Sequence, residues 1–134
     1  MSRVYAVEKG CNLETLRGGY ANSFQFLNAT DPSAVPSALA DFTHTPGAGV
    51  ALLTLDGRGN YVEKFTVSVG GLILRLEGSG TYTVNSDCTG ARVLNINGGP
   101  QGLQFDFVIA DNGREVHELS AQQGDVALNR WKKQ

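Results

Sequence analysis

The chain has 134 residues, a formal net charge of −2 and two cysteines. This length forms a single domain with a sizeable core, and the charge excludes the basic surface that binding to nucleic acids or anionic membranes requires. Glycine contributes 17 residues, and charged side chains make up only 18% of the chain. This composition favours many short strands joined by tight turns over long helices.

No segment reaches the length of an apolar membrane span, about 20 residues. Residues 1–8 also lack the apolar run of a signal peptide, so the sequence as written predicts a cytoplasmic protein with no membrane partner. A secreted or periplasmic location is the alternative if a signal peptide has been removed. The basic C-terminal segment, Arg130-Trp131-Lys132-Lys133, is predicted to be a solvated tail.

An N-terminal arm, residues 1–17, precedes the first strand, and residues 12–17 are expected to form one helical turn capped by Asn12. Beyond the arm, alternating apolar and polar residues are interrupted by turn sequences such as Asp56-Gly57-Arg58-Gly59-Asn60. The pattern predicts strands at residues 20–27, 50–55, 61–69, 72–84, 91–96, 103–110, 115–121 and 126–131. Within the fourth, Gly78-Ser79-Gly80 predicts a bulge or a sharp bend.

Consecutive strands with mostly short turns are typical of an all-β, eight-stranded antiparallel up-and-down β-barrel, whose closure leaves no exposed edge. A two-sheet β-sandwich is the alternative. We expect residues 18–134 to form one barrel domain. The long connection at residues 28–48 contains three of the four prolines, which is consistent with a lid, a binding loop or a padded surface loop. Leu39 and Phe42 in this connection favour contact with something apolar.

Alternation assigns one face of each predicted strand to the barrel interior. The interior faces are clearest where apolar residues recur at every second position: Phe65, Val67 and Val69; Leu72, Leu74 and Leu76; Leu103, Phe105, Phe107 and Ile109. Side chains in phase with such faces are candidates for contact with a small hydrophobic molecule. The candidates are Tyr20, Asn22, Phe24, Tyr61, Phe65, Leu74, Phe105 and Phe107, with Leu39 and Phe42 of the long connection.

Three further residues are candidates for catalysis. Glu63 shares the predicted interior face of Phe65, where burial would raise its pKa and suit it to general acid or base chemistry. At the barrel rim, Glu63 would instead reach solvent. His117 is in phase with Leu119, and Tyr82 falls on an interior face if the glycine-rich break preserves the register. His117 and Tyr82 also have ordinary structural interpretations, as a core histidine and a barrel aromatic.

Cys88 lies in the turn Asn85-Ser86-Asp87-Cys88-Thr89-Gly90. No base, metal partner or helix N-terminus is adjacent to it, which argues against a nucleophile. Because Cys11 precedes the first strand and both cysteines fall near a barrel end, we favour a Cys11–Cys88 disulfide. In a reducing cytosol they would be two buried thiols. The two histidines and two distant cysteines give no zinc spacing, and nucleotide-binding motifs are absent, so we expect no metal and no cofactor.

Three segments carry a family resemblance: Cys11-Asn12-Leu13 with Leu16-Arg17-Gly18-Gly19-Tyr20, then Leu55-Asp56-Gly57-Arg58-Gly59-Asn60, and most specifically Gly80-Thr81-Tyr82-Thr83-Val84-Asn85-Ser86-Asp87-Cys88-Thr89-Gly90. Together they resemble a group of small bacterial proteins of unknown function, and this resemblance implies a secreted small β-protein. More remotely, the layout is similar to calycin and allene oxide cyclase-like barrels. That similarity implies an apolar cavity in which some members cyclise reactive polyenes.

Two functional hypotheses follow. In the first, the barrel is a cyclase or isomerase of specialised metabolism that holds a hydrophobic substrate in a reactive orientation in its lumen. In the second, it is a lipocalin-like, non-catalytic carrier of a small hydrophobic ligand. A barrel packed solid, with its function on the outer surface, is a third alternative, and an internal cavity distinguishes it from the other two. The sequence leaves a homodimer open.

Overall fold

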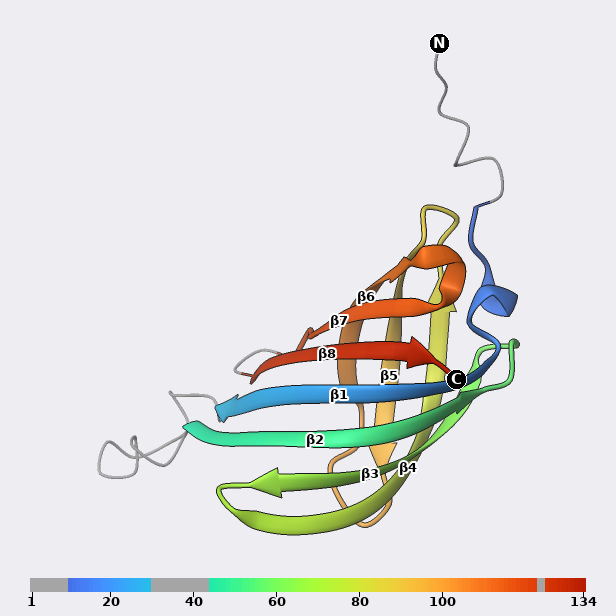
Figure 1. The fold of residues 1–134 in the computed structure, drawn as a ribbon. Helices are drawn as coiled ribbons and strands as arrows, with labels where there is room; N and C mark the ends of the chain where they lie inside the picture. Colours follow the sequence, from blue (N-terminus) through green and yellow to red (C-terminus); the bar gives the residue numbers. More distant parts are fainter. Residues whose placement is uncertain (1–9, 30–43, 123–124) are drawn as a thin grey trace.

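The computed structural model describes residues 10–29, 44–122 and 125–134, which form a closed antiparallel barrel (Figure 1). Its strands are β1 (Gly18–Ala29), β2 (His44–Leu55), β3 (Asn60–Val69), β4 (Leu72–Val84), β5 (Thr89–Ile96), β6 (Leu103–Ala110), β7 (Glu115–Ser120) and β8 (Asp125–Lys133). Each strand pairs with the next, and β8 pairs with β1. The predicted eight-stranded up-and-down barrel is therefore confirmed, and the β-sandwich is wrong.

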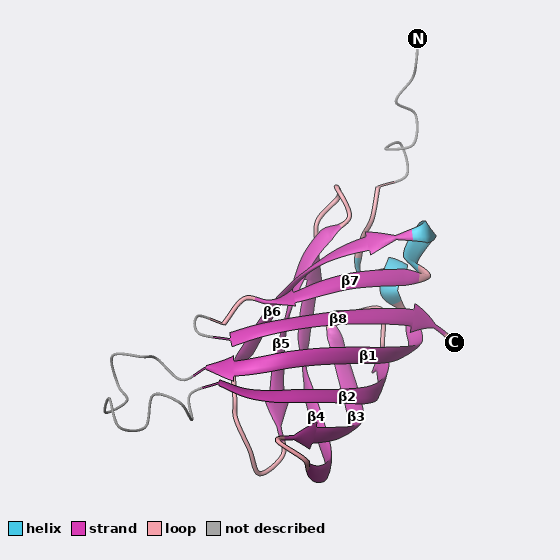
Figure 2. Ribbon diagram, turned by 60° about the vertical axis from the view of Figure 1, so that its left-hand side comes forward, coloured by secondary structure: helices cyan, strands magenta, loops and turns pink. Residues whose placement is uncertain are grey.

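Two short 3-10 helices, η2 (Leu13–Leu16) and η5 (Asp111–Gly113), lie at the same end of the barrel (Figure 2). We call this the closed end, and we call the opposite end, where β1 ends and β2 begins, the mouth. The helix η2 confirms the predicted turn in the arm. Its first turn is held by Thr15, whose Oγ1 accepts a hydrogen bond of 2.9 Å from the backbone N–H of Asn12. No helix in the described ranges is long and apolar enough to cross a membrane.

The described part of the arm, residues 10–17, packs into the closed end as part of the barrel core. Leu16 is fully buried there, together with Tyr20 of β1. The hydroxyl of Tyr82 donates a hydrogen bond of 3.1 Å to the carbonyl oxygen of Leu13. The hydroxyl of Tyr20 donates a hydrogen bond to the carbonyl oxygen of Gly113. The apolar burial and the two tyrosine hydrogen bonds together seal this end.

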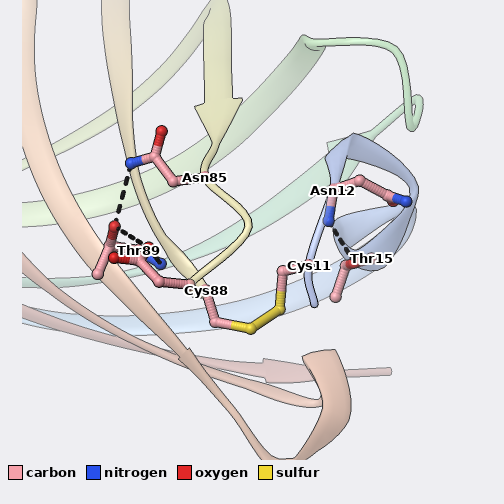
Figure 3. The surroundings of a disulfide bond; sticks show 7 residues. Cys11, Asn12, Thr15, Asn85, Cys88 and Thr89 are labelled. Atoms are coloured by element: carbon pink, nitrogen blue, oxygen red, sulfur yellow. Dashed lines mark hydrogen bonds between the residues drawn. A yellow bond between two sulfur atoms is a disulfide. The ribbon is translucent and has the colours of Figure 1, made fainter. Parts of the chain in front are cut away.

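A disulfide ties the arm to the turn between β4 and β5 (Figure 3). It joins Cys11 to Cys88 across a sequence separation of 77 residues, with the two Cα atoms 5.0 Å apart. The backbone N–H of Cys11 also donates to the carbonyl oxygen of Ser86, at 3.1 Å. The disulfide expected from the positions of the two cysteines is therefore present, and it closes a long loop of the chain.

The first hairpin is longer than the sequence predicts. Residues placed in the 28–48 connection continue both strands, because β1 runs to Ala29 and β2 begins at His44. The reason lies in two inward-facing glycines: Gly47 is paired with Phe26, and Gly49 with Phe24. The phenylalanine rings occupy the space that a Cβ atom at either glycine would need, so a sequence typical of a loop is stable as a strand. The rest of the predicted connection, including Leu39 and Phe42, lies outside the described residues.

The sequence predicted a bulge or a sharp bend at Gly78-Ser79-Gly80, and strand β4 contains no bulge there. Its pairing with β3 and with β5 continues through these residues without a change of register, and Figure 1 shows the strand curving around the barrel wall. Gly80 permits this close packing, since a Cβ atom there would lie 1.8 Å from the carbonyl oxygen of Val93. The unbroken register places Tyr82 on the interior face, as its phase required.

We predict that Gly80→Ala lowers the free energy of unfolding by about 1–3 kcal/mol, because the backbone of β5 must move away from β4. The measurement is chemical denaturation followed by far-UV circular dichroism. Gly19→Ala is the matched control, because the nearest atom to its added Cβ is the Leu53 carbonyl oxygen at 3.9 Å. Equal losses in the two variants would contradict the role given to Gly80.

Candidate functional site

The barrel lumen contains a cavity of about 480 Å³ that extends toward the mouth. Its wall is mainly apolar and comes from all strands except β2. The residues that line it are Phe24, Phe26, Glu63, Phe65, Val67, Val69, Leu74, Leu76, Arg92, Leu94, Ile96, Pro100, Leu103, Phe105, Ser120, Gln122, Asp125, Ala127 and Asn129. The described residues therefore do not pack the barrel solid, and a volume of this size is typical of small-molecule sites.

Four of the predicted contact residues line this cavity. Phe24, Phe65, Leu74 and Phe105 form parts of its apolar wall. Glu63 also lines it, with only 3% of its surface exposed, so its placement on an interior face rather than at the rim agrees with the structure. These residues come from four strands that alternation alone had oriented correctly.

The other predicted interior residues are buried but lie outside the cavity lining. They are Tyr20, Asn22, Tyr61, Tyr82 and Phe107. Tyr82 bonds to the arm and Tyr20 to η5, so both serve the closed end. We therefore correct their expected roles: Tyr20 and Tyr82 hold the arm and η5 in place, and neither reaches the lumen.

A buried ion cluster forms the inner end of the cavity. Arg92 of β5 binds Glu118 of β7 through two hydrogen bonds, Nε to Oε2 at 2.6 Å and Nη2 to Oε1 at 2.7 Å. Its Nη1 donates to Oε1 of Glu63 at 2.9 Å and to the hydroxyl of Tyr61 at 3.1 Å. Asn129 of β8 donates from Nδ2 to Oε1 of Glu118 at 2.6 Å. Two carboxylates therefore share one guanidinium. The bond between Arg92 and Glu118 is bidentate, which fixes the orientation of the guanidinium group.

Aromatic rings enclose the guanidinium group. The Cζ atom of Arg92 lies 4.3 Å from the centre of the Phe105 ring, 5.2 Å from that of Trp131 and 5.5 Å from that of Tyr61. Trp131 is fully buried, and its indole N–H donates to Oε1 of Glu118 at 3.3 Å. The predicted solvated tail is therefore wrong at this residue. Stacking and cation–π attraction help to offset the cost of removing the arginine charge from water.

Burial has opposite effects on the charges in this cluster. It raises the pKa of Glu63, and neighbouring Glu118 raises it further, although Arg92 opposes both. Burial alone would lower the pKa of Arg92, but the two glutamates outweigh it and raise that pKa further above its usual range. Burial also raises the pKa of Tyr61 to about 12. Near neutral pH the arginine is therefore charged and the tyrosine is neutral, and burial favours the protonated form of Glu63.

The predicted placement of His117 on an interior face is wrong. Its side chain is 48% exposed on the outside of the barrel, where Nε2 lies 2.7 Å from Oε2 of Glu115. The interior face of β7 instead carries Val116 and Glu118, which pair with Trp131 and Asn129 of β8. Leu119, the residue whose phase had placed His117 inside, is exposed. His117 cannot act on a molecule in the lumen.

Sequence reasoning missed Arg92, Glu118, Asn129 and Trp131. One signal was present for Arg92, since it alternates with the same phase as Leu94 and Ile96, both of which are buried. For Glu118 the short strand β7 gave no decisive alternation.

The Oδ1 atom of Asn22 is buried without a hydrogen-bond partner among the described residues. Such an atom ordinarily binds an ordered water.

The described part of the chain contains no cluster of three histidine, cysteine or acidic side chains able to hold a metal ion. No family model matches the chain, and no curated protein or solved structure matches it either. The features of the molecule that point to a function are therefore the cavity and the ion cluster at its inner end.

Proposed function

We propose that this protein binds a small hydrophobic molecule in the barrel lumen. The observation that carries the proposal is the cavity of about 480 Å³, whose apolar wall ends in a buried polar cluster. Pockets that are mostly apolar with a few fixed polar groups are typical of ligand sites, because the wall supplies affinity and the polar groups supply orientation. The cluster is held by hydrogen bonds between side chains of four strands, so it is preorganised before any ligand arrives.

The test uses N-phenyl-1-naphthylamine, an uncharged probe that fluoresces in apolar surroundings. We expect the wild-type protein to bind it, and Ala127→Leu to weaken binding by about tenfold or more, because the larger side chain fills part of the cavity. Ala21→Leu, on the exposed outer face of neighbouring β1, should leave the affinity unchanged. Absence of binding to the wild-type protein, or equal binding by Ala127→Leu, would overturn the proposal.

Catalysis by a cyclase or isomerase mechanism is a second candidate function, and Glu63 is the observation that favours it. This carboxyl lines the cavity, and burial raises its pKa, which is the direction that suits a carboxyl acting as a general acid or base. The candidate now depends on Glu63 alone, since His117 is outside the barrel and Tyr82 serves the closed end. Tyr61 assists indirectly, through its hydrogen bond with Arg92.

The two functions are separated by identifying a co-purified ligand by native mass spectrometry and incubating it with fresh protein. A carrier returns the molecule unchanged. An isomerase or cyclase converts it, and Glu63→Gln should then abolish conversion while Glu77→Gln, on the outer face of β4, retains it. Conversion that persists in Glu63→Gln would remove the proton-transfer mechanism.

A further inference from the structure

We propose that the lumen selects amphiphiles with a cationic amine head over those with a carboxylate head. This inference rests on the proposed function and specifies the chemistry of the ligand. An arginine inside an apolar barrel suggests, at first sight, a site for fatty acids. The contacts of Arg92 point to the opposite preference.

The charge of Arg92 is already neutralised by protein. Two carboxylates, Glu63 and Glu118, lie 2.9 and 2.6 Å from its nitrogen atoms, and all three side chains are at most 3% exposed. A ligand carboxylate would add a third negative charge beside one positive charge, in a place that water does not screen. To make room for it, Arg92 would have to give up the bidentate bond to Glu118.

The remaining charges of the cavity have the same sign. Arg92 is the only basic side chain among the described residues that line it, whereas Glu63 and Asp125 are acidic. Asp125 lies at the start of β8, on the mouth side, and Glu63 lies at the inner end. A cation therefore meets an acidic group along its path and another where it stops.

Glu63 is also the group with spare capacity for a hydrogen bond. Among the described residues its hydrogen-bond donor is Arg92, which reaches Oε1. Oε2 accepts no hydrogen bond from them, and the side chain lines the cavity. An ammonium head has only donors, so it complements this free acceptor, whereas a carboxylate has only acceptors. A neutral hydroxyl can donate one hydrogen bond but gains no charge–charge attraction.

Binding of the cation should favour the ionised form of Glu63. The groups that face Glu63 are Arg92 on β5, Glu118 on β7 and Tyr61 on its own strand, and burial raises the pKa of its carboxyl. At a pH where that carboxyl is protonated, binding of the cation releases its proton. An ammonium group beside Oε2 stabilises the ionised form and lowers the pKa of Glu63. The affinity for an amine must therefore rise with pH through the folded-state pKa of Glu63, while the ligand itself stays charged up to about pH 10.

The experiment measures displacement of N-phenyl-1-naphthylamine by decylamine, decanol and decanoic acid, which share one tail and differ in the head. We expect decylamine to bind about tenfold or more tightly than decanol, and decanoic acid to bind most weakly. Glu63→Gln should remove most of the preference for the amine and leave the affinity for decanol nearly unchanged. Glu77→Gln is the matched control and should keep the preference. Calorimetry in buffers of different ionisation enthalpy should detect the released proton.

The outcomes distinguish the two proposals. If none of the three compounds binds and the probe does not bind, the proposed function fails. If decanol or decanoic acid binds more tightly than decylamine, the lumen remains a binding site but the preference for amines is wrong. A preference for decylamine that survives in Glu63→Gln, without proton release, would also overturn the assignment, because the selectivity would then arise elsewhere.

Discussion

Replacing Arg92 with methionine is expected to lower the free energy of unfolding by about 3–5 kcal/mol. The substitution keeps a long side chain but leaves Glu63 and Glu118 buried without a counter-charge, 3% and 2% exposed respectively. Denaturant titration at neutral pH gives the loss. The loss should shrink as the pH falls, beginning above about 4.3, the ordinary pKa of glutamate, because burial raises the pKa of Glu63 and a protonated side chain needs no counter-charge.

Two further variants test the cause. Arg75→Met changes an exposed arginine on the outer face of β4 and should alter stability by no more than about 0.5 kcal/mol. Adding Glu63→Gln and Glu118→Gln to Arg92→Met removes the orphaned charges and should recover part of the loss. If Arg92→Met costs less than about 1 kcal/mol, water must reach the carboxylates, and the cluster is not the dry inner end described above.

Loss of the disulfide is expected to cost about 2–4 kcal/mol of unfolding free energy. The bridge joins residues separated by 77 positions, so its removal frees a large loop in the unfolded chain. The double variant Cys11→Ser/Cys88→Ser should show this loss, and dithiothreitol should produce an equal loss in the wild-type protein. The double variant itself should be insensitive to dithiothreitol, which controls for effects of the reductant elsewhere.

The arm should remain docked after reduction, because Leu16 is fully buried and Leu13 accepts the Tyr82 hydroxyl. Probe binding in the lumen is therefore expected to persist in the reduced protein. Wild-type stability that does not change in dithiothreitol, together with two free thiols in the denatured protein, would contradict the bridge.

The alternation of apolar and polar residues predicted the inward-facing side chains well in strands whose two faces differ clearly in polarity. On β6 and β3 most apolar residues occupy one phase, with Val108 and Val62 as exposed exceptions, so Phe105 and Phe65 were placed correctly. In β7, Glu-Val-His-Glu-Leu-Ser, each phase carries one apolar residue, and the local pattern could not decide between them. The pairing partners decide: Glu118 lies between Phe107 on β6 and Asn129 on β8, both buried, so it must face inward.

The ion cluster could not be predicted because its members come from strands that are distant in sequence and not all adjacent in the sheet. Glu63 is on β3, Arg92 on β5 and Glu118 on β7, and they meet across the lumen rather than along a hairpin. In the sequence, a single charged residue among the apolar residues of one face suggests that the inward face of the strand has been assigned incorrectly. It becomes plausible only when its partners are known, which requires the closed barrel itself.

Because one end of the barrel is sealed, the lumen is closed at that end. Residues 10–17 of the arm, η5 and the disulfide occupy one end (Figure 3), so among the described residues a ligand bound as proposed has one direction of entry and inserts its head first. Its tail then points toward the mouth, where extra length displaces none of the described residues. A lumen open at one end selects strongly for the head group of a ligand and weakly for the length of its tail. Ligands that share one head group should therefore lose little affinity as the tail grows.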